Sequence, residues 1–231
     1  MTRLAWLSDT GDLGWFPPVS QALKDPDGLL AAGGGLSVER LLAAYRRGIF
    51  PWYNDGQPVL WWSPDPRNVL FPSEFHRSRS LRKSLRTRRY TTSIDIAFAA
   101  VVQACAEPRA SGPGTWITAD MAAAYGRLHA LGYAHSIETW HDGRLVGGVY
   151  GVCLGRVFFG ESMFSRATDA SKVALARLVD ECLVRGIVLI DCQVASAHLE
   201  SLGSRPLRRS EFVRLLDEHV GGVCAWGAAQ R

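Results

Sequence analysis

Three strand-like runs follow one another in the middle of this chain, separated only by short reversals. They cover residues 133–140, 144–154 and 156–164, and the reversals are His141-Asp142-Gly143 and Gly155. Asp-Gly pairs and single glycines are typical of the tight turns of β-hairpins. The runs therefore predict three adjacent antiparallel strands, which any fold of this chain must place in one sheet.

Helical patterns lie on both sides of these strands. Ser93 and Thr118 stand where two helices could begin before the hairpins, and Ser210 stands where a last helix could begin. Residues 171–185 repeat apolar side chains at the spacing of one helical face, and a β-branched strand is predicted over residues 187–194. This order predicts an α+β fold with helices packed against a central sheet.

The first 65 residues have a different composition. They are rich in tryptophan, glycine and proline, which predicts short elements joined by turns. One helix is predicted from Ser37, which can cap its first turn, to about residue 47, before Gly48. The prolines within residues 63–66 indicate a boundary. We therefore expect a small N-terminal domain, residues 1–65, and a larger C-terminal domain, residues 66–231.

Composition excludes several classes of protein. Hydrophobic residues make up 47% of the chain and charged residues 21%, which is the ordinary globular mixture. The N-terminus has no secretory signal, and no stretch approaches the roughly 18–20 apolar residues of a membrane span. Five cysteines without a C-x-x-C motif predict reduced thiols. We expect a cytoplasmic protein without membrane contact.

The charge of the chain is concentrated in one run, from His76 to Tyr90. The whole sequence has 26 basic and 22 acidic residues, whereas the sequence without this run has 19 basic and 22 acidic residues. Such a patch attracts polyanions, nucleic acid above all. The alternative is an ordinary solvated helix face. The basic residues of the run are Arg77, Arg79, Arg82, Lys83, Arg86, Arg88 and Arg89.

Most familiar catalytic motifs are missing from the sequence. It has neither of the glycine-rich phosphate-binding patterns and no histidine or cysteine spacing typical of a metal site. The segment Gly160–Phe164 lacks the second glycine of a serine nucleophile elbow. Cys192 has no histidine near it in the sequence, so we interpret it as a buried thiol. We therefore predict neither metal nor cofactor.

Two segments keep a chemical interpretation. In the strand LIDCQV, residues 189–194, alternation predicts that Asp191 and Gln193 share one face. A buried carboxylate is costly unless it is paired, so these residues form either a structural hydrogen-bond network or part of a site. In FFGESMFS, residues 158–165, Glu161 lies among aromatic residues and Met163. This segment is either a pocket wall with one polar group or a hairpin edge with an exposed glutamate.

A family resemblance extends over residues 16–216. The most specific of the segments that carry it are GIFPW, WWSPDPR, GESMFS and LIDCQ; others are TWIT, LGYAHSIETW, LVGGVYGV, ASKVAL and SLGSRPLRR. Together they resemble the leucyl/phenylalanyl-tRNA–protein transferases. One departure is visible, since the family has an acidic residue in the turn where this chain has Gly35-Leu36.

The resemblance implies a fold and an activity. The fold is a small aromatic-rich N-terminal lobe followed by a C-terminal domain similar to the GNAT acyltransferases. The activity is transfer of leucine or phenylalanine from aminoacyl-tRNA to the N-terminal Arg or Lys of acceptor proteins, in the N-end rule degradation pathway. The tRNA ester is already activated, so aminolysis requires no cofactor. We expect leucyl-tRNA and phenylalanyl-tRNA as partners, and a monomer.

The resemblance also implies roles for single residues. Asp191 and Gln193 match the reacting centre, where they would orient and assist the attacking amine. Trp52 and Trp116 match tryptophans that contact the terminal adenosine, and the basic run matches the tRNA backbone surface. The remaining matches are two polar positions, Tyr125 and Glu161, and a pocket for the aminoacyl side chain formed by Val149, Phe158, Leu178 and Ile190.

Two alternatives belong to other functional classes. An acetyl-CoA-dependent N-acyltransferase would use a glycine-containing loop for pyrophosphate, but the loop before Ser171 is SRATDAS and contains no glycine. A non-catalytic RNA-binding module would use the basic run and the aromatic residues. It would leave Glu161, Asp191 and Gln193 without a purpose.

Overall fold

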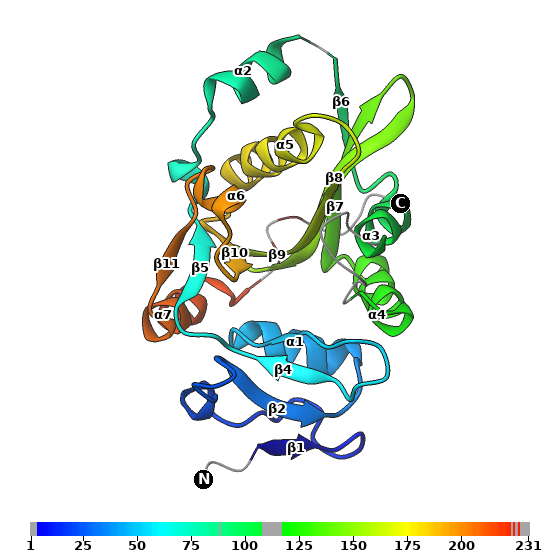
Figure 1. The fold of residues 1–231 in the computed structure, drawn as a ribbon. Helices are drawn as coiled ribbons and strands as arrows, with labels where there is room; N and C mark the ends of the chain where they lie inside the picture. The colour runs from blue at the N-terminus through cyan, green and yellow to red at the C-terminus, as the bar shows by residue number, and fades with distance from the viewer. Residues whose placement is uncertain (1–3, 88, 108–116, 223, 225, 227–231) are drawn as a thin grey trace.

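A seven-stranded mixed sheet forms the centre of the molecule in the computed structural model, which describes residues 4–87, 89–107, 117–222, 224 and 226 (Figure 1). The strand order is β11-β5-β10-β9-β8-β7-β6, and every neighbouring pair is antiparallel except β9 and β10. The strands are β5 (Arg67–Leu70), β6 (Thr91–Ile94), β7 (Ala134–His141), β8 (Arg144–Leu154), β9 (Val157–Ser165), β10 (Leu189–Gln193) and β11 (Arg205–Leu207).

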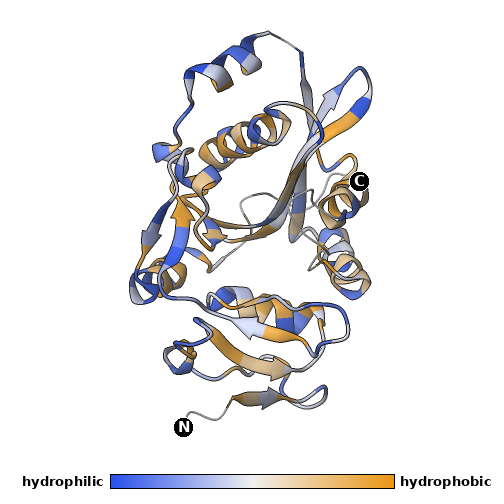
Figure 2. Ribbon diagram, in the orientation of Figure 1, coloured by the Kyte–Doolittle hydropathy of each residue, from blue (hydrophilic) through white to orange (hydrophobic). Residues whose placement is uncertain are grey.

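Helices cover both faces of this sheet. Helix α5 packs its apolar residues on one face, while α3, α4 and α7 lie against the other (Figure 1). Figure 2 shows the contrast between helix α5, which is largely hydrophobic, and the hydrophilic helix α2 at the far end of the molecule. The helices are α2 (Arg79–Arg86), α3 (Phe98–Ala106), α4 (Ala119–Ala130), α5 (Ala170–Val184), α6 (Ala197–Glu200) and α7 (Arg209–His219).

A second, four-stranded sheet forms the N-terminal lobe, with strand order β1-β2-β4-β3. Its elements are β1 (Ala5–Leu7), β2 (Leu29–Gly33), α1 (Val38–Arg46), β3 (Phe50–Pro51) and β4 (Leu60–Trp62). Ser37 caps α1 by accepting a hydrogen bond from the backbone N–H of Arg40, as predicted. One apolar core contains residues of this lobe and of the large sheet, so the two parts share their interior.

The lobes meet at the turn between α1 and β3. Gly48 has φ of +72°, and a Cβ there would lie 2.8 Å from the Phe212 ring of α7. Only glycine meets both conditions without strain. Because Gly48 packs closely against α7, the start of β3 is held beside the large sheet.

The α+β class and the three hairpin strands are confirmed, and β8 has the predicted bounds. The prediction of a helix opening at Ser93 is wrong, because residues 91–94 form the edge strand β6 and α3 begins at Phe98. The edge strand β11 and its neighbour β5 have no counterpart among the predicted elements. The last helix begins at Arg209 rather than Ser210. The boundary at residue 65 stays a prediction.

Over the described residues, no helix is both long enough and apolar enough to cross a membrane.

Candidate active site

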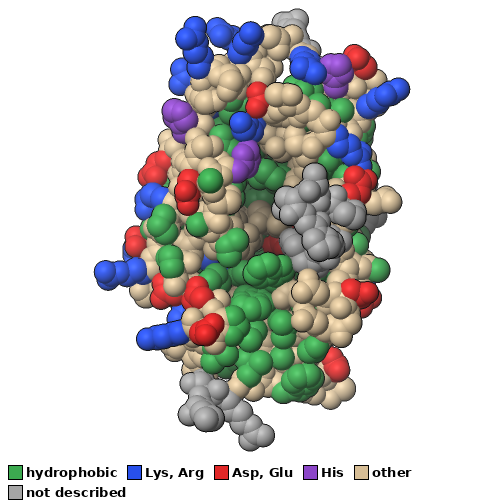
Figure 3. All heavy atoms as spheres, in the orientation of Figure 1, with side chains coloured by type: hydrophobic (Ala, Val, Ile, Leu, Met, Phe, Trp, Pro, Cys, Tyr) green, Lys and Arg blue, Asp and Glu red, His purple; other side chains and the backbone are tan. Residues whose placement is uncertain are grey.

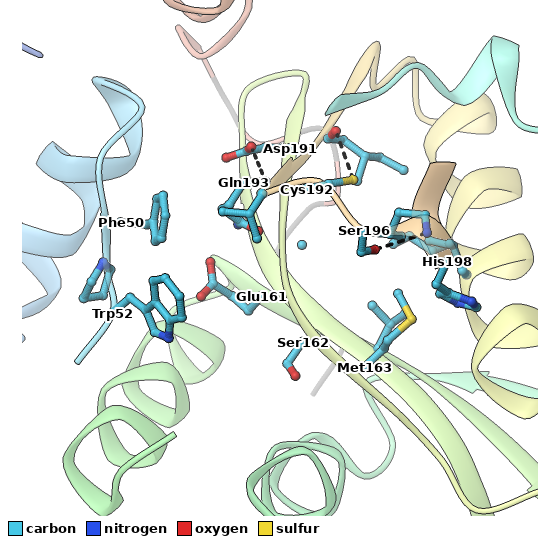
Figure 4. Close-up of a pocket in the computed structure, with 18 residues that line it drawn as sticks. Phe50, Trp52, Glu161, Ser162, Met163, Asp191, Cys192, Gln193, Ser196 and His198 are labelled. Carbon is cyan, nitrogen blue, oxygen red and sulfur yellow. Dashed lines mark hydrogen bonds between the residues drawn. The ribbon is translucent and has the colours of Figure 1, made fainter. Parts of the chain in front are cut away.

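A cavity of about 500 Å³ opens between the N-terminal lobe and the large sheet. Its walls come from residues 50–52 beside β3, residues 160–163 of β9, residues 190–194 at the end of β10, and parts of β8, α5 and α6. Figure 4 shows Trp52 and Glu161 on the side of the N-terminal lobe and His198 on the opposite side. Strands β9 and β10, the one parallel pair of the sheet, supply the floor.

Most of the predicted catalytic and substrate-binding residues lie together in this cavity. Seven line it: Trp52, Val149, Glu161, Leu178, Ile190, Asp191 and Gln193. Phe158 does not line it, and its buried side chain packs behind the wall in the same apolar cluster as Val149 and Ile190. Trp116 and Arg88 lie outside the described residues.

A buried ion pair holds the carboxylate of Asp191. Arg67 donates from Nε to Oδ1 at 2.8 Å and from Nη2 to Oδ2 at 2.6 Å, and its Nη1 donates to the carbonyl oxygen of Gly48 at 3.0 Å. The guanidinium lies 4.7 Å from the centroid of the Phe50 ring and 4.8 Å from that of Phe212. Both charged side chains are almost fully buried. Asp191 is therefore a fixed, neutralised group.

A β-bulge follows Asp191. Asp191 pairs with Val69 and Gln193 pairs with Asn68, so Cys192 is an extra residue in the strand. Val69 and Asn68 are neighbours on β5 and point to opposite faces, and Gln193 has φ of +56°. The bulge interrupts the alternation on which the prediction of a shared face for Asp191 and Gln193 depends, although both residues line the cavity.

The bulge changes how these two residues interact. Asp191 Oδ1 accepts the backbone N–H of Gln193 at 3.0 Å, rather than a bond from its side-chain amide. Among the described residues, the buried Nε2 of Gln193 has no hydrogen-bond partner. A strained backbone and an unpartnered polar group in a cavity are typical of a functional position. Gln193 thus presents a free amide to whatever enters the cavity.

Glu161 accepts hydrogen bonds from two buried tyrosines. Tyr45 donates to Oε1 at 2.7 Å and Tyr125 to Oε2 at 2.5 Å, and the two hydroxyl oxygens are 2.8 Å apart. Burial raises the pKa of Glu161 to about 7, although both tyrosine hydrogen bonds act in the opposite direction. Burial and the nearby Glu161 also raise the pKa of both tyrosines, so they stay neutral donors. Glu161 therefore changes its charge near neutral pH.

Two tryptophans form an aromatic surface at the cavity rim. The side chain of Trp52 is 44% exposed, and its ring centroid lies 5.7 Å from that of Trp62. Trp62 Nε1 donates to the carbonyl oxygen of Trp52 at 2.7 Å, which fixes the backbone there. Figure 3 shows hydrophobic side chains from the middle of this face down over the N-terminal lobe. The rim is suited to stacking a flat ring.

The opposite wall is apolar. Leu175 and Leu178 of α5, Ile190 of β10 and Val149 of β8 line it, together with Met163 of β9. The position of Met163 in this wall agrees with the prediction that residues 158–165 form the wall of a pocket. Such a wall selects an aliphatic or aromatic side chain by shape, and methionine adapts to both.

The predicted basic run forms helix α2 and the residues beside it. Leu81 is buried and attaches α2 to the body, whereas Arg79, Arg82, Lys83, Arg86 and Arg89 are exposed. Arg77 forms an ion pair with Asp180 of α5. In Figure 3, Lys and Arg side chains gather at the top of the view, over α2. The run is therefore a cationic surface at a distance from the cavity.

Sequence reasoning missed two residues that organise the site, Arg67 and Tyr45. Arg67 ends the motif WWSPDPR, but nothing in that motif indicates a partner more than 120 residues later. Tyr45 matches the apolar stripe of α1, and its hydroxyl reaches Glu161 only through the docking of the lobe. Both depend on pairings that are distant in sequence.

Comparisons with known proteins give consistent matches. A family model described as "Leucyl/phenylalanyl-tRNA protein transferase" matches residues 69–217, and one described as its N-terminal domain matches residues 34–65. A leucyl/phenylalanyl-tRNA–protein transferase of Pseudomonas fluorescens (strain SBW25) is 57% identical, over 94% of this chain and 95% of its own. One from Aromatoleum aromaticum is 60% identical, over 90% and 87%.

Solved structures give a more distant likeness. A GCN5-related N-acetyltransferase from Kribbella flavida superposes with a TM-score of 0.41 and 13% sequence identity. The superposition covers 71% of this chain and 58% of that one.

The Arg67–Asp191 pair yields a prediction about stability. Arg67→Ala leaves a buried carboxylate without its partner, so we expect the free energy of unfolding to fall by about 3–5 kcal/mol. The control is Arg77→Ala, which breaks the exposed pair with Asp180 and should cost at most about 1 kcal/mol. Urea denaturation measures both. Equal losses in the two variants would contradict the structural role of Arg67.

Proposed function

This chain belongs to the leucyl/phenylalanyl-tRNA–protein transferase family, and we propose that its cavity moves leucine or phenylalanine from charged tRNA to the N-terminal amine of an acceptor protein. One observation carries the proposal: a single cavity brings an aromatic rim, an apolar wall, a free amide and a titratable carboxylate together. These are the groups that the two substrates of this reaction require.

The proposal has the enzyme recognise the aminoacyl-tRNA by its terminal adenosine and the amino acid that it carries. In the proposal, the terminal adenine stacks on Trp52, since contacts between bases and aromatic side chains contribute about 1–3 kcal/mol each. The family resemblance assigns the same task to Trp116. The esterified leucine or phenylalanine side chain then enters the apolar wall beside Leu178 and Ile190. This places the ester carbonyl near Gln193.

The reaction is aminolysis of the ester. A C–N bond forms between the acceptor amine and the carbonyl carbon, the C–O bond to the ribose breaks, and the ribose oxygen gains a proton as the amine loses one. In the proposal, Gln193 Oε1 accepts a hydrogen bond from the amine, which orients its lone pair. Asp191 is a positioning residue, because its carboxylate holds the Gln193 backbone and is neutralised by Arg67.

The acceptor needs a free amine and, in the proposal, a cationic first side chain. Because Asp191 is paired with Arg67, Glu161 is the acid of the cavity that can match this cation. Charge matching without a bidentate fork accommodates both Arg and Lys. This specificity would place the enzyme in the N-end rule degradation pathway.

Helix α2 is assigned to the tRNA backbone. Its exposed cations lie on the α5 side of the cavity, where Ser84 donates to Asp169 at 3.0 Å and so fixes α2 against the start of α5. Phosphate contacts of this kind position a nucleic acid without reading its sequence. We further propose that one chain acts alone, because a single chain supplies every group named, and that it works in the cytoplasm, where charged tRNA is made.

The alternative of an acetyl-CoA-dependent enzyme has an observation against it. Such enzymes bind pyrophosphate at a helix N-terminus. Here the carboxylate of Asp169 is at the start of α5, paired with Lys172 at 3.3 Å, and Ser165 Oγ accepts the backbone N–H of Ser171. The alternative of a non-catalytic RNA-binding module leaves the arrangement around Gln193 unexplained.

The proposed function is tested by mixing the protein with leucyl-tRNA and a peptide that begins with arginine. Mass spectrometry should detect the peptide with one added leucine, and none with an N-acetylated peptide. Gln193→Ala should lower turnover at least tenfold, because a single hydrogen bond in a dry site contributes about 1.4 kcal/mol or more to the transition state. An unmodified arginine peptide under these conditions would contradict the proposal.

Helix α2 gives a prediction about salt. Replacing Arg82, Lys83 and Arg86 with glutamine removes up to three phosphate contacts, so the negative slope of log affinity against log salt should become shallower by up to about 3. Binding of charged tRNA at several salt concentrations measures the slope. Transfer from a short aminoacyl-adenosine should stay nearly unchanged, since it does not reach α2.

The control for this variant removes the same charge elsewhere. Arg144, Arg156 and Arg214 are exposed and lie outside α2, so replacing them with glutamine should leave the slope close to that of the wild type. If the two triple variants behave alike, the surface of α2 is an ordinary solvated helix face.

The titration of Glu161 gives a prediction about acceptor choice. Its pKa of about 7 means that the cavity gains a negative charge as pH rises from 6 to 8. The preference for an arginine peptide over the matching citrulline peptide should therefore increase about five- to tenfold over this range, equivalent to about 1–1.4 kcal/mol. Deprotonation of the α-amine affects both peptides equally and cancels in this ratio.

The matched variant is Glu161→Gln, which keeps a hydrogen-bonding side chain but does not titrate. Its preference should stay constant between pH 6 and 8 in the same competition assay. If the wild-type preference did not change with pH, Glu161 would have no part in acceptor recognition. The proposal of acyl transfer would still stand.

A further inference from the structure

A second group of reactive side chains lies on the sheet outside the cavity. Cys153 of β8 and His135 of β7 are both fully buried, and the half-buried Cys224, in the segment after α7, is beside them. Asp95, between β6 and α3, completes the group. The proposed transfer reaction uses none of these residues.

Hydrogen bonds connect the group in a chain. Asp95 Oδ2 lies 2.8 Å from His135 Nδ1, and the carbonyl oxygen of Gly132 lies 3.1 Å from His135 Nε2. Cys224 forms side-chain hydrogen bonds with both His135 and Cys153. The two thiols are therefore neighbours, with an imidazole beside one of them.

The position of Cys224 is fixed by Trp226. The Trp226 ring stacks on His135 at 5.1 Å between centroids, and its backbone N–H donates to Cys224 Sγ at 3.3 Å. Arg185 of α5 lies over the same ring at 4.9 Å and donates to the Trp226 carbonyl oxygen at 2.8 Å. Trp226 also contacts Phe158, with 5.5 Å between the ring centroids.

Electrostatics make the two thiols unequal. Hydrogen bonds from Cys153 and His135 lower the pKa of Cys224 below that of an ordinary thiol, although partial burial acts against ionisation. Burial opposes the charge of His135, but its bonds to Asp95 and Cys224 raise its pKa. The pKa of Cys153 is raised, first by its hydrogen bond to Cys224 and then by burial. A thiolate next to an imidazolium is the arrangement of reactive cysteines.

We propose that Cys224 is an oxidant-reactive site whose thiolate attacks a hydroperoxide and then closes a disulfide with Cys153. In the first step, the sulfur attacks one peroxide oxygen, the O–O bond breaks, and the sulfur becomes a sulfenic acid with release of hydroxide, or of an alkoxide from an organic peroxide. In the second step, the Cys153 thiol attacks this sulfur, the S–S bond forms, and water leaves. The peroxide supplies both oxidising equivalents.

The other buried cysteines nearby differ from Cys224. Burial raises the pKa of Cys182 on α5 and of Cys192 on β10, so both remain thiols at neutral pH. Because the thiolate is the reactive form of cysteine, Cys224 should react faster than Cys182 and Cys192. The disulfide would tie the segment carrying Trp226 to β8, against Phe158.

The experiment uses the whole reduced protein and hydrogen peroxide at one equivalent. After alkylation of the remaining thiols and digestion, mass spectrometry should find one cross-linked peptide pair that contains Cys153 and Cys224. Cys224→Ser should abolish it, while Cys153→Ser should leave a sulfenic acid on Cys224 that dimedone traps. The control Cys182→Ala removes another buried thiol and should leave the cross-link in place.

A second measurement does not depend on oxidation. The rate of iodoacetamide labelling of Cys224 should rise with pH around a midpoint below that of an ordinary cysteine thiol. His135→Gln should move this midpoint upward by at least one pH unit, which slows labelling about tenfold per unit at pH values below both midpoints. Labelling of Cys224 no faster than that of Cys182 at pH 6, or a cross-link between other cysteines, would overturn the proposal.

Discussion

The ion pair between Arg67 and Asp191 decides how this molecule is assembled. A guanidinium and a carboxylate removed from water are stable together only if nearly every polar atom is bonded, and here Gly48 of the N-terminal lobe supplies the remaining acceptor. The pair therefore joins β5, β10 and the N-terminal lobe at one point. The rings of Phe50 and Phe212 enclose it, so the position of the lobe and of the bulge in β10 follow from one contact.

The sequence predicts the parts of the fold that depend on local signals. The hairpins of β7, β8 and β9 are predictable because Asp142-Gly143 and Gly155 specify turns, and α1 because Ser37 caps it. The strands at the sheet edges are short and polar, and their pairings are distant in sequence, so local patterns cannot identify them. Residues 91–94 illustrate this, since a capping serine there favours a helix and pairing with β7 makes a strand.

The sequence predicts which residues form the candidate site better than it predicts how those residues are arranged. Motifs placed Glu161, Asp191 and Gln193 together, and the cavity contains all three. Their relation to one another depends on a bulge, which one extra residue creates and alternation cannot predict. Tyr45 could not be predicted, because its hydroxyl meets Glu161 only after the two lobes dock.

The contacts between the two lobes constrain how this chain can evolve. The N-terminal lobe supplies Tyr45 to Glu161 and Gly48 to Arg67, and both contacts lie where the two sheets share one core. Recombination that exchanged residues 1–65 for an unrelated module would leave a buried guanidinium and a buried carboxyl group each short of a partner. Such a chimera would be destabilised even if its substrate-binding residues were unchanged. The two parts of this chain are therefore constrained to be inherited together, and a substitution on one side limits which residues the other can accept.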